Sequence, residues 1–198
     1  MEKLTLSKGL IAIGAVEKGN KTTYAIRLAN ELAKKEKVLY LNWTDFADRL
    51  HYLIKKGGSD INKNLDINTN IGYFDVGSFI TIMELIETNN YSTIFIDDIN
   101  YFSQSGAEFD VFDEINSNGK DNVIRALRYI ADKLNVRVVF NITIYANETP
   151  KLADFVWSRL IINDCDQVIA LNENDNNLEI FNLKNEKLEI EKYEIELT

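Results

Sequence analysis

One segment near the start of the chain limits the fold more than any other: an apolar run, a loop of small and charged residues, and the beginning of a helix. It covers residues 9–24 and reads Gly-Leu-Ile-Ala-Ile-Gly-Ala-Val-Glu-Lys-Gly-Asn-Lys-Thr-Thr-Tyr. In such a layout, backbone N–H groups and the positive end of the helix face a phosphate, a lysine reaches the β- and γ-phosphates, and a hydroxyl binds Mg²⁺. Lys21 and Thr22 stand where the last two groups are needed. The segment therefore predicts a phosphate-binding loop for a nucleotide with Mg²⁺.

The loop departs from the pattern G-x-x-x-x-G-K-[ST], and two registers fit it. With Lys21 as the motif lysine, Ala15 and Asn20 occupy the two glycine positions; with Gly14 and Gly19 as the glycines, Asn20 is an inserted residue. We favour the first register, because asparagine tolerates a positive φ better than other non-glycine residues. An ordinary strand-to-helix turn is the alternative for so short a segment. The favoured register assigns nucleotide binding to Ala15, Lys18, Gly19, Asn20, Lys21, Thr22 and Thr23.

Strand-length apolar runs alternate with amphipathic segments along most of the chain. Helical spacing occurs at 22–35, 45–56, about 78–87 and 123–134, and apolar runs at 38–42, around 71–74, 93–97 and 136–142, with a polar loop at 59–70. This order predicts an α/β fold: a mostly parallel sheet covered by helices on both faces, with ligands at the carboxyl ends of the strands.

The pattern changes near the C-terminus. After an apolar run at 168–171, residues 178–183 and 188–195 alternate apolar and polar with period two, and 172–177 is a run of Asn, Asp and Glu. We expect an antiparallel hairpin at the end of the sheet, with one wet face, and a solvent-exposed turn at 172–177.

Size and charge narrow the function classes. A chain of 198 residues with 45% hydrophobic content can bury a core of its own, so we expect a single domain over 1–198. The net charge of −9 argues against a broad nucleic-acid surface and disfavours DNA binding. A local basic patch of Arg125, Arg128, Lys133 and Arg137 leaves DNA binding open, although Asp121 and Asp132 lie among these residues. No apolar run is long enough for a membrane span and no signal peptide is evident, so we expect a cytoplasmic protein. Cys165 is the only cysteine, which excludes an internal disulfide and indicates a buried, inert thiol.

A second motif fits the first. Bound Mg²⁺ needs an aspartate at the tip of a buried strand next to the strand that feeds the loop, and Asp97 ends the apolar run at 93–97. A strand that merely reaches solvent would also end in a polar residue. The sequence thus predicts Thr22 and Asp97 as metal ligands. Asp98 is a candidate catalytic base, although strand alternation places it on the opposite face.

Taken in order, these segments resemble the RecA-like motor domain of DnaB-type replicative helicases. The resemblance lies in residues 9–15 and 20–29 for the first strand and its helix, 37–42 for the second strand, 94–97 for the Walker B strand, 123–136 for the next helix and strand, and 164–171 for a late strand. It implies a RecA-like P-loop NTPase fold, ATP and Mg²⁺ as cofactors, and a role in DNA replication or recombination. It also implies a homo-oligomer or a helicase or other replication protein as partner.

The catalytic positions of the family are replaced. Its glutamate falls at Thr44, with Asp45 one residue away as a second candidate base, and its phosphate-sensing glutamine falls in 140–143, where Asn141 and Thr143 are polar. The arginine finger is missing near 184–186, and the loop at 103–121, which should grip DNA, is rich in acids. We therefore expect ATP binding with weak or partner-dependent hydrolysis. The alternative is a catalytically inactive pseudo-ATPase that binds a helicase or another replication protein as a regulator or scaffold.

Overall fold

The computed structural model describes residues 5–17, 19–69, 76–99, 119–146, 149–155, 158–174, 177–184 and 191–196. The strands of this part of the chain are β1 (Leu10–Ala15), β2 (Val38–Asn42), β3 (Leu65–Asn68), β4 (Thr93–Asp97), β5 (Arg137–Thr143), β6 (Gln167–Asn174), β7 (Asn177–Lys184) and β8 (Glu191–Glu196). The helices are α1 (Lys21–Leu32), α2 (Ala47–Lys56), α3 (Val76–Asn89), α5 (Gly119–Leu134), α6 (Ser158–Asp164) and the short 3₁₀ helix η1 (Leu152–Asp154).

All these strands join one sheet in the order β3-β2-β4-β5-β1-β6-β7-β8. The pairs from β3 to β6 are parallel, and the last two pairs, β6 with β7 and β7 with β8, are antiparallel. The expected α/β fold is thus confirmed, including the C-terminal antiparallel strands. That residues 1–198 form a single domain stays a prediction.

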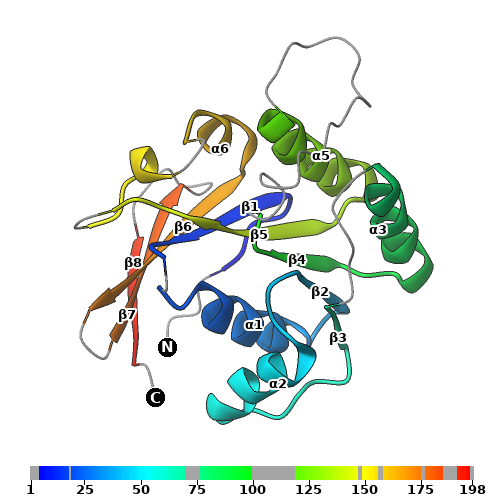
Figure 1. Cartoon of the computed structure of the whole chain (residues 1–198), viewed down its shortest axis with the longest axis horizontal. Helices are drawn as coiled ribbons and strands as arrows, with labels where there is room; N and C mark the ends of the chain where they lie inside the picture. Colours follow the sequence, from blue (N-terminus) through cyan, green and yellow to red (C-terminus); the bar gives the residue numbers. More distant parts are fainter. Residues whose placement is uncertain are drawn as a thin grey trace.

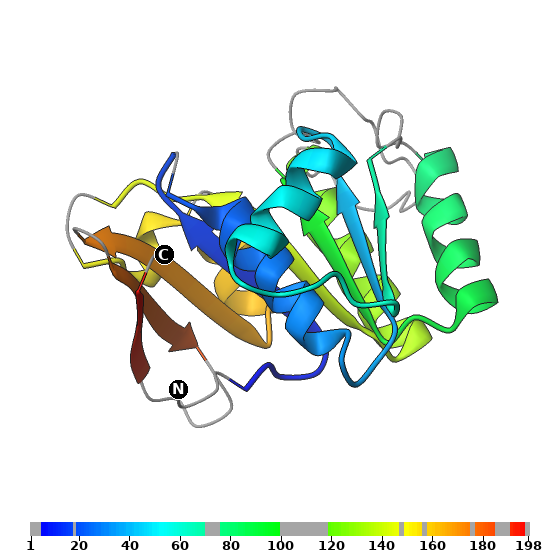
Figure 2. The same cartoon turned by 90° about the horizontal axis from the view of Figure 1, so that it is seen from below.

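Helices cover both faces of the sheet (Figures 1 and 2). Alternate residues of each inner strand point to opposite sides, as a pleated strand requires. One core lies under α1 and α2, where Ile26 and Leu50 pack against Ile13 and Tyr40 of the sheet. The other lies under α3, α5 and α6. Because both faces of β1, β2 and β4 are buried, these strands read as continuous apolar runs.

Two expectations about the sheet were wrong. We expected the strand that ends at Asp97 beside the strand that feeds the phosphate loop, but β5 lies between β4 and β1. The polar stretch 59–70, expected as a loop, contains the edge strand β3. β3 has only two apolar residues, Leu65 and Ile67. Two alternating apolar residues within a polar stretch are weak evidence for a strand. The strand expected around 71–74 lies outside the described residues.

The expected turn at 172–177 is also shorter than predicted, because β6 continues to Asn174 and β7 begins at Asn177. Asn172 and Glu179 face each other across the two strands, and the Asn172 amide donates to the Glu179 carboxylate at 3.0 Å. Cross-strand pairing of this kind lets polar residues continue a ladder. Among the described helices, none combines the length and apolar character that crossing a membrane requires.

Candidate functional site

The link between β1 and α1 begins the site. Asn20 has φ 56° and ψ 20°, a left-handed conformation, and the first helical bond runs from the Tyr24 N–H to the Asn20 carbonyl at 2.9 Å. The Asn20 side chain makes no capping hydrogen bond to the helix backbone, and no group of the described residues accepts from the backbone N–H of Lys21, Thr22 or Thr23. An open helix start of this kind fits an anion such as a phosphate.

The geometry favours the first register of the motif. Asn20 has the positive φ that this register requires, and Gly14 lies inside β1 rather than in the loop. A Cβ on Gly14 would lie 2.5 Å from a ring carbon of Phe155, so this glycine serves core packing. Gly19 is in the loop itself, where a Cβ would approach the Val16 carbonyl oxygen to 2.9 Å. Ala15 ends the strand and is buried, and Lys18 lies outside the described residues.

Lys21 connects the helix start to two other strands. Its Nζ donates to Thr143 Oγ1 at the end of β5, at 3.1 Å, and lies 3.6 Å from Asp98 Oδ2 just after β4. The side chains of Lys21 and Asp98 are 12% and 18% exposed. The candidate lysine is therefore held at the carboxyl edge of the sheet by one residue from β5 and one that follows β4.

Asp97 is in a different environment from its neighbour. It is 1% exposed, and its Oδ2 accepts hydrogen bonds from the Tyr40 hydroxyl at 2.8 Å and the Asn42 amide at 2.9 Å. Its Oδ1 accepts one from the Asn141 amide at 2.6 Å. Burial, and then the neighbouring Asp97, raise the pKa of Tyr40 well above its usual range, so the hydroxyl stays protonated as a donor. That Asp97 binds a metal stays a prediction.

The side chain of Asp98 faces Lys21 at the carboxyl edge of the sheet. Strand alternation in the sequence had predicted the opposite face. The reason is that β4 ends at Asp97, so the alternation does not extend to the next residue. The ion pair with Lys21 brings Asp98 to the site, and the sequence offered no signal for this beyond its position after an apolar strand.

Asp45, the second candidate base, is turned toward α2, the helix that begins two residues later. Its carboxylate pairs with Arg49 one turn later, and its N–H donates to Asn42 Oδ1 at 2.6 Å. The Thr44 N–H donates to the same oxygen at 2.9 Å. Residues 42–45 thus form a tight turn. The Asn42 side chain accepts from the backbone of this turn through its Oδ1 and donates to Asp97 through its amide N–H.

Two further polar contacts were not anticipated. The Asn20 amide donates to Glu173 Oε2 at 2.8 Å, which places an acid from the end of β6 beside the loop. The Lys184 ammonium donates to the carbonyls of Ile162 and Cys165, at the C-terminal end of α6. Lys184, near the position of the family's finger residues, therefore caps a helix of its own chain. In the first turn of α1, the Thr23 hydroxyl donates to Asn20 Oδ1 at 3.4 Å.

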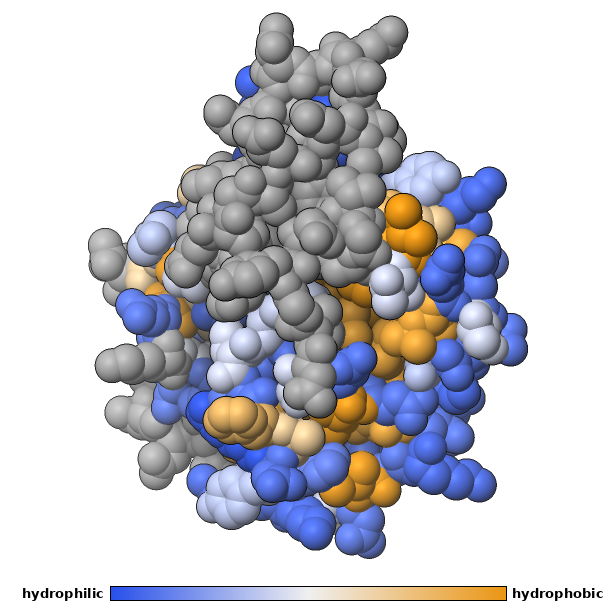
Figure 3. All heavy atoms as spheres, turned by 45° about the vertical axis from the view of Figure 1, so that its right-hand side comes forward, coloured by the Kyte–Doolittle hydropathy of each residue, from blue (hydrophilic) through white to orange (hydrophobic). Residues whose placement is uncertain are grey.

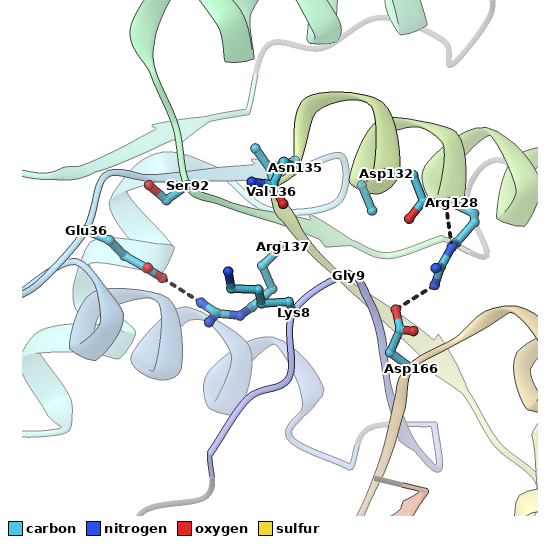
Figure 4. A pocket seen from close by; sticks show the side chains of 11 residues that line it. Lys8, Gly9, Glu36, Ser92, Arg128, Asp132, Asn135, Val136, Arg137 and Asp166 are labelled. Atoms are coloured by element: carbon cyan, nitrogen blue, oxygen red, sulfur yellow. Dashed lines mark hydrogen bonds and ion pairs between the residues drawn. The ribbon is translucent and has the colours of Figure 1, made fainter. Parts of the chain in front are cut away.

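A hollow of about 620 Å³ lies at the opposite, amino-terminal edge of the sheet (Figure 4). The two arginines that line it, Arg128 and Arg137, belong to the segment 125–137, where basic and acidic residues are mixed. Arg128 pairs with Asp132 and Asp166, and Arg137 pairs with Glu36. Each arginine is thus paired with at least one acid that also lines the hollow, and Lys8 is a third basic residue there. The acidic loop at 103–121 lies, up to residue 118, outside the described residues.

Comparison with known structures supports the RecA-like fold. A solved structure described as an ATPase domain matches with a TM-score of 0.69 and 16% identity, over 94% of this chain and 80% of that one. "The Structure Of A DnaB-Like Replicative Helicase And Its Interactions With Primase" matches with a TM-score of 0.70 and 16% identity. That match covers 96% of this chain and 55% of the other, so the present chain spans about half of that helicase. No family model and no curated protein matches the sequence. The expected likeness to DnaB-like ATPase domains is confirmed as a likeness of fold.

Proposed function

We propose that this protein binds ATP with Mg²⁺ at the β1–α1 loop and hydrolyses it slowly, or only with a partner, in DNA replication or recombination. The observation that carries the proposal is the position of Lys21: at the first residue of α1, its ammonium lies between Thr143 and Asp98 at the carboxyl edge of the sheet. Ligands of parallel α/β sheets bind at this edge.

The residues of the loop fit the nucleotide. Residues 15 and 19–23 would surround the phosphates: the N–H groups of the first helical turn would donate to them, and Lys21 would neutralise their charge. Lys18, which the sequence assigns to the same site, lies outside the described residues. The hydroxyl of Thr22 and a carboxylate from the pair Asp97 and Asp98 hold Mg²⁺. A metal ion held by these residues would supply positive charge that offsets the charge of the phosphates.

Slow hydrolysis follows from the surroundings of the candidate bases. Thr44 replaces the glutamate of the family, and Asp45 is paired with Arg49. Asp98 is paired with Lys21, so its carboxylate is engaged by the lysine that we assign to the phosphates. A correctly placed base contributes roughly 10²–10⁴-fold to such a reaction. An arginine finger adds about 10³–10⁵-fold where one is present, and a partner would have to supply it here.

The second candidate is a pseudo-ATPase that docks on a helicase or another replication protein. Three observations favour it: Asp45 is occupied by Arg49, Lys184 caps α6, and two aromatic residues near the loop edge are exposed, Phe46 to 83% and Tyr145 to 78%. Figure 3 also shows apolar side chains at the surface on the side of the molecule where α3 lies, and Ile80 of α3 is exposed.

Two measurements separate the candidates. Titration of the protein with Mg·ATP, compared with Lys21→Ala, tests binding. Phosphate release with and without single-stranded DNA tests turnover: DNA-stimulated release supports the ATPase, and binding without release supports the pseudo-ATPase. If the folded wild-type protein does not bind Mg·ATP, the loop is not a nucleotide site. The ATPase is then excluded, and docking on a helicase or another replication protein is the remaining candidate.

A further inference from the structure

The two adjacent acids at the end of β4, Asp97 in the strand and Asp98 just after it, have different surroundings, which the motif does not indicate. We propose that Asp98 supplies the carboxylate that faces the Mg²⁺ of a bound nucleotide, and that Asp97 is a positioning residue held in a buried clamp. The inference rests on the proposed function, since it concerns the same nucleotide site. It reverses the expectation that Asp97 binds the metal.

The clamp consists of Tyr40, Asn42 and Asn141, whose side chains donate to both oxygens of Asp97 at 2.6–2.9 Å. Asn42 of β2 is the strand partner of Asp97 of β4. On the other side of β4, Phe140 of β5 is the strand partner of Ile96, and Asn141 follows Phe140. The carboxylate thus joins three neighbouring strands at their ends. Hydrogen bonds to an ionised carboxylate are among the strong ones, and those of a buried group are costly to give up. Turning Asp97 toward a metal would break them.

The amide of Asn141 supports this interpretation. Its Nδ2 donates to Asp97, while its buried Oδ1 has no hydrogen-bond partner among the described residues. The reversed amide would place Oδ1 against a carboxylate oxygen, where two acceptors repel. Asn141 therefore keeps an unsatisfied carbonyl in order to keep its bond to Asp97. The bond to Asp97 determines how Asn141 is oriented, as expected for a structural clamp.

Asp98 has the properties that Asp97 lacks. Its side chain is 18% exposed, and its Oδ2 lies 3.6 Å from the Nζ of Lys21. A carboxylate this close to the phosphate-binding lysine lies where the phosphates and their metal would be, and carboxylate oxygens are preferred Mg²⁺ ligands. A carboxylate that faces the metal is not available to take a proton from the attacking water. The division of tasks therefore also accounts for slow hydrolysis.

The test compares two isosteric variants of neighbouring residues, Asp97→Asn and Asp98→Asn. For each protein, the ATP dissociation constant is measured with Mg²⁺ and with EDTA, and the thermal midpoint is measured without nucleotide. We expect Asp98→Asn to reduce the Mg²⁺-dependent gain in affinity at least about fivefold and to leave the midpoint within about 2 °C. We expect Asp97→Asn to lower the midpoint by about 5 °C or more, because an amide in its place turns a donor toward the donors of the clamp. It should keep the Mg²⁺-dependent gain within about threefold.

A loss of the Mg²⁺-dependent gain in Asp97→Asn, or its retention in Asp98→Asn, would overturn the inference. If Asp97→Asn does not fold, Tyr40→Phe provides the same comparison, since it removes one donor and leaves the carboxylate. It should lower the midpoint and keep the gain. The midpoint without nucleotide tests the clamp even if the wild-type protein fails to bind ATP, so a failure of the proposed function is distinguishable from a failure of the clamp. An unchanged midpoint in both Asp97→Asn and Tyr40→Phe would contradict the clamp.

Discussion

The carboxylate of Glu173 accepts a hydrogen bond from the side chain of Asn20 at 2.8 Å, so an acid from the end of β6 lies beside the loop that we assign to the phosphates. The two residues are 153 positions apart in the chain. Because β6 pairs with β1 in parallel, both strands deliver their carboxyl ends to the same edge. An acid at this point opposes the approach of a negatively charged nucleotide.

This relationship predicts that Glu173→Gln strengthens ATP binding. The amide keeps the shape of the side chain and removes a charge that repels the phosphates, and we expect an increase of roughly two- to fivefold at low ionic strength. The measurement is the dissociation constant of Mg·ATP at about 20 and about 200 mM salt. Glu31→Gln is the matched control, because Glu31 lies on α1 in an exposed pair with Lys34, and it should change the constant less than about twofold. An unchanged or weaker affinity in Glu173→Gln would show that the acid does not oppose the nucleotide.

Gly9 predicts a stability effect at the other end of β1. It has φ +87°, and a Cβ there would lie 2.0 Å from Asp166 Oδ2, which accepts the Leu10 N–H and pairs with Arg128. Gly58 has a similar φ of +75°, but nothing lies within 4 Å of its Cβ position. Gly58→Ala should therefore cost only the conformational strain, about 1 kcal/mol. Gly9→Ala should cost about 2–4 kcal/mol, because the clash adds to the strain.

Urea denaturation measures the free energy of unfolding of the wild-type protein, Gly9→Ala and Gly58→Ala. The loss in Gly9→Ala should exceed the loss in Gly58→Ala. Equal losses in the free energy of unfolding would mean that Asp166 can move away from Gly9 at no cost.

Cys165 predicts the pH dependence of stability. Burial raises the pKa of its thiol far above the usual range, so the folded protein keeps the proton that the unfolded chain loses above about pH 8.5. The unfolded state then binds fewer protons, and the free energy of unfolding falls as pH rises, by at most about 1.4 kcal/mol per pH unit for one group. Denaturation between about pH 7.5 and about pH 9.5 should show this fall, and Cys165→Ala should show a smaller one. Parallel curves for the two proteins would contradict the assignment.

The sequence predicted the alternation of strands and helices well, because the inner strands are buried on both faces and carry apolar runs. It failed at β3, a four-residue edge strand whose two apolar residues carry too little signal. It also failed on the place of β4, because the order of strands in a sheet depends on which faces the crossovers cover, and local periodicity does not record it.

The nucleotide-binding and metal-binding roles assigned to the loop and to the two acids stay predictions, but the structure shows which of their positions could be foreseen from the sequence. A positive φ at Asn20 and the place of Lys21 follow from residue type and motif order. The hydrogen bonds that bury Asp97 do not, since they come from Tyr40, Asn42 and Asn141, which lie on two other strands and carry no motif. The approach of Glu173 depends likewise on the pairing of β6 with β1.

The most direct test of a nucleotide site at the β1–α1 loop is a calorimetric titration of Mg·ATP into the wild-type protein, Lys21→Ala and the control Lys34→Ala. We predict saturable binding in the wild-type and control proteins, and binding at least about 30-fold weaker, or about 2 kcal/mol, in Lys21→Ala. Equal affinity in all three proteins, or no binding to folded wild-type protein, would contradict a nucleotide site at this loop.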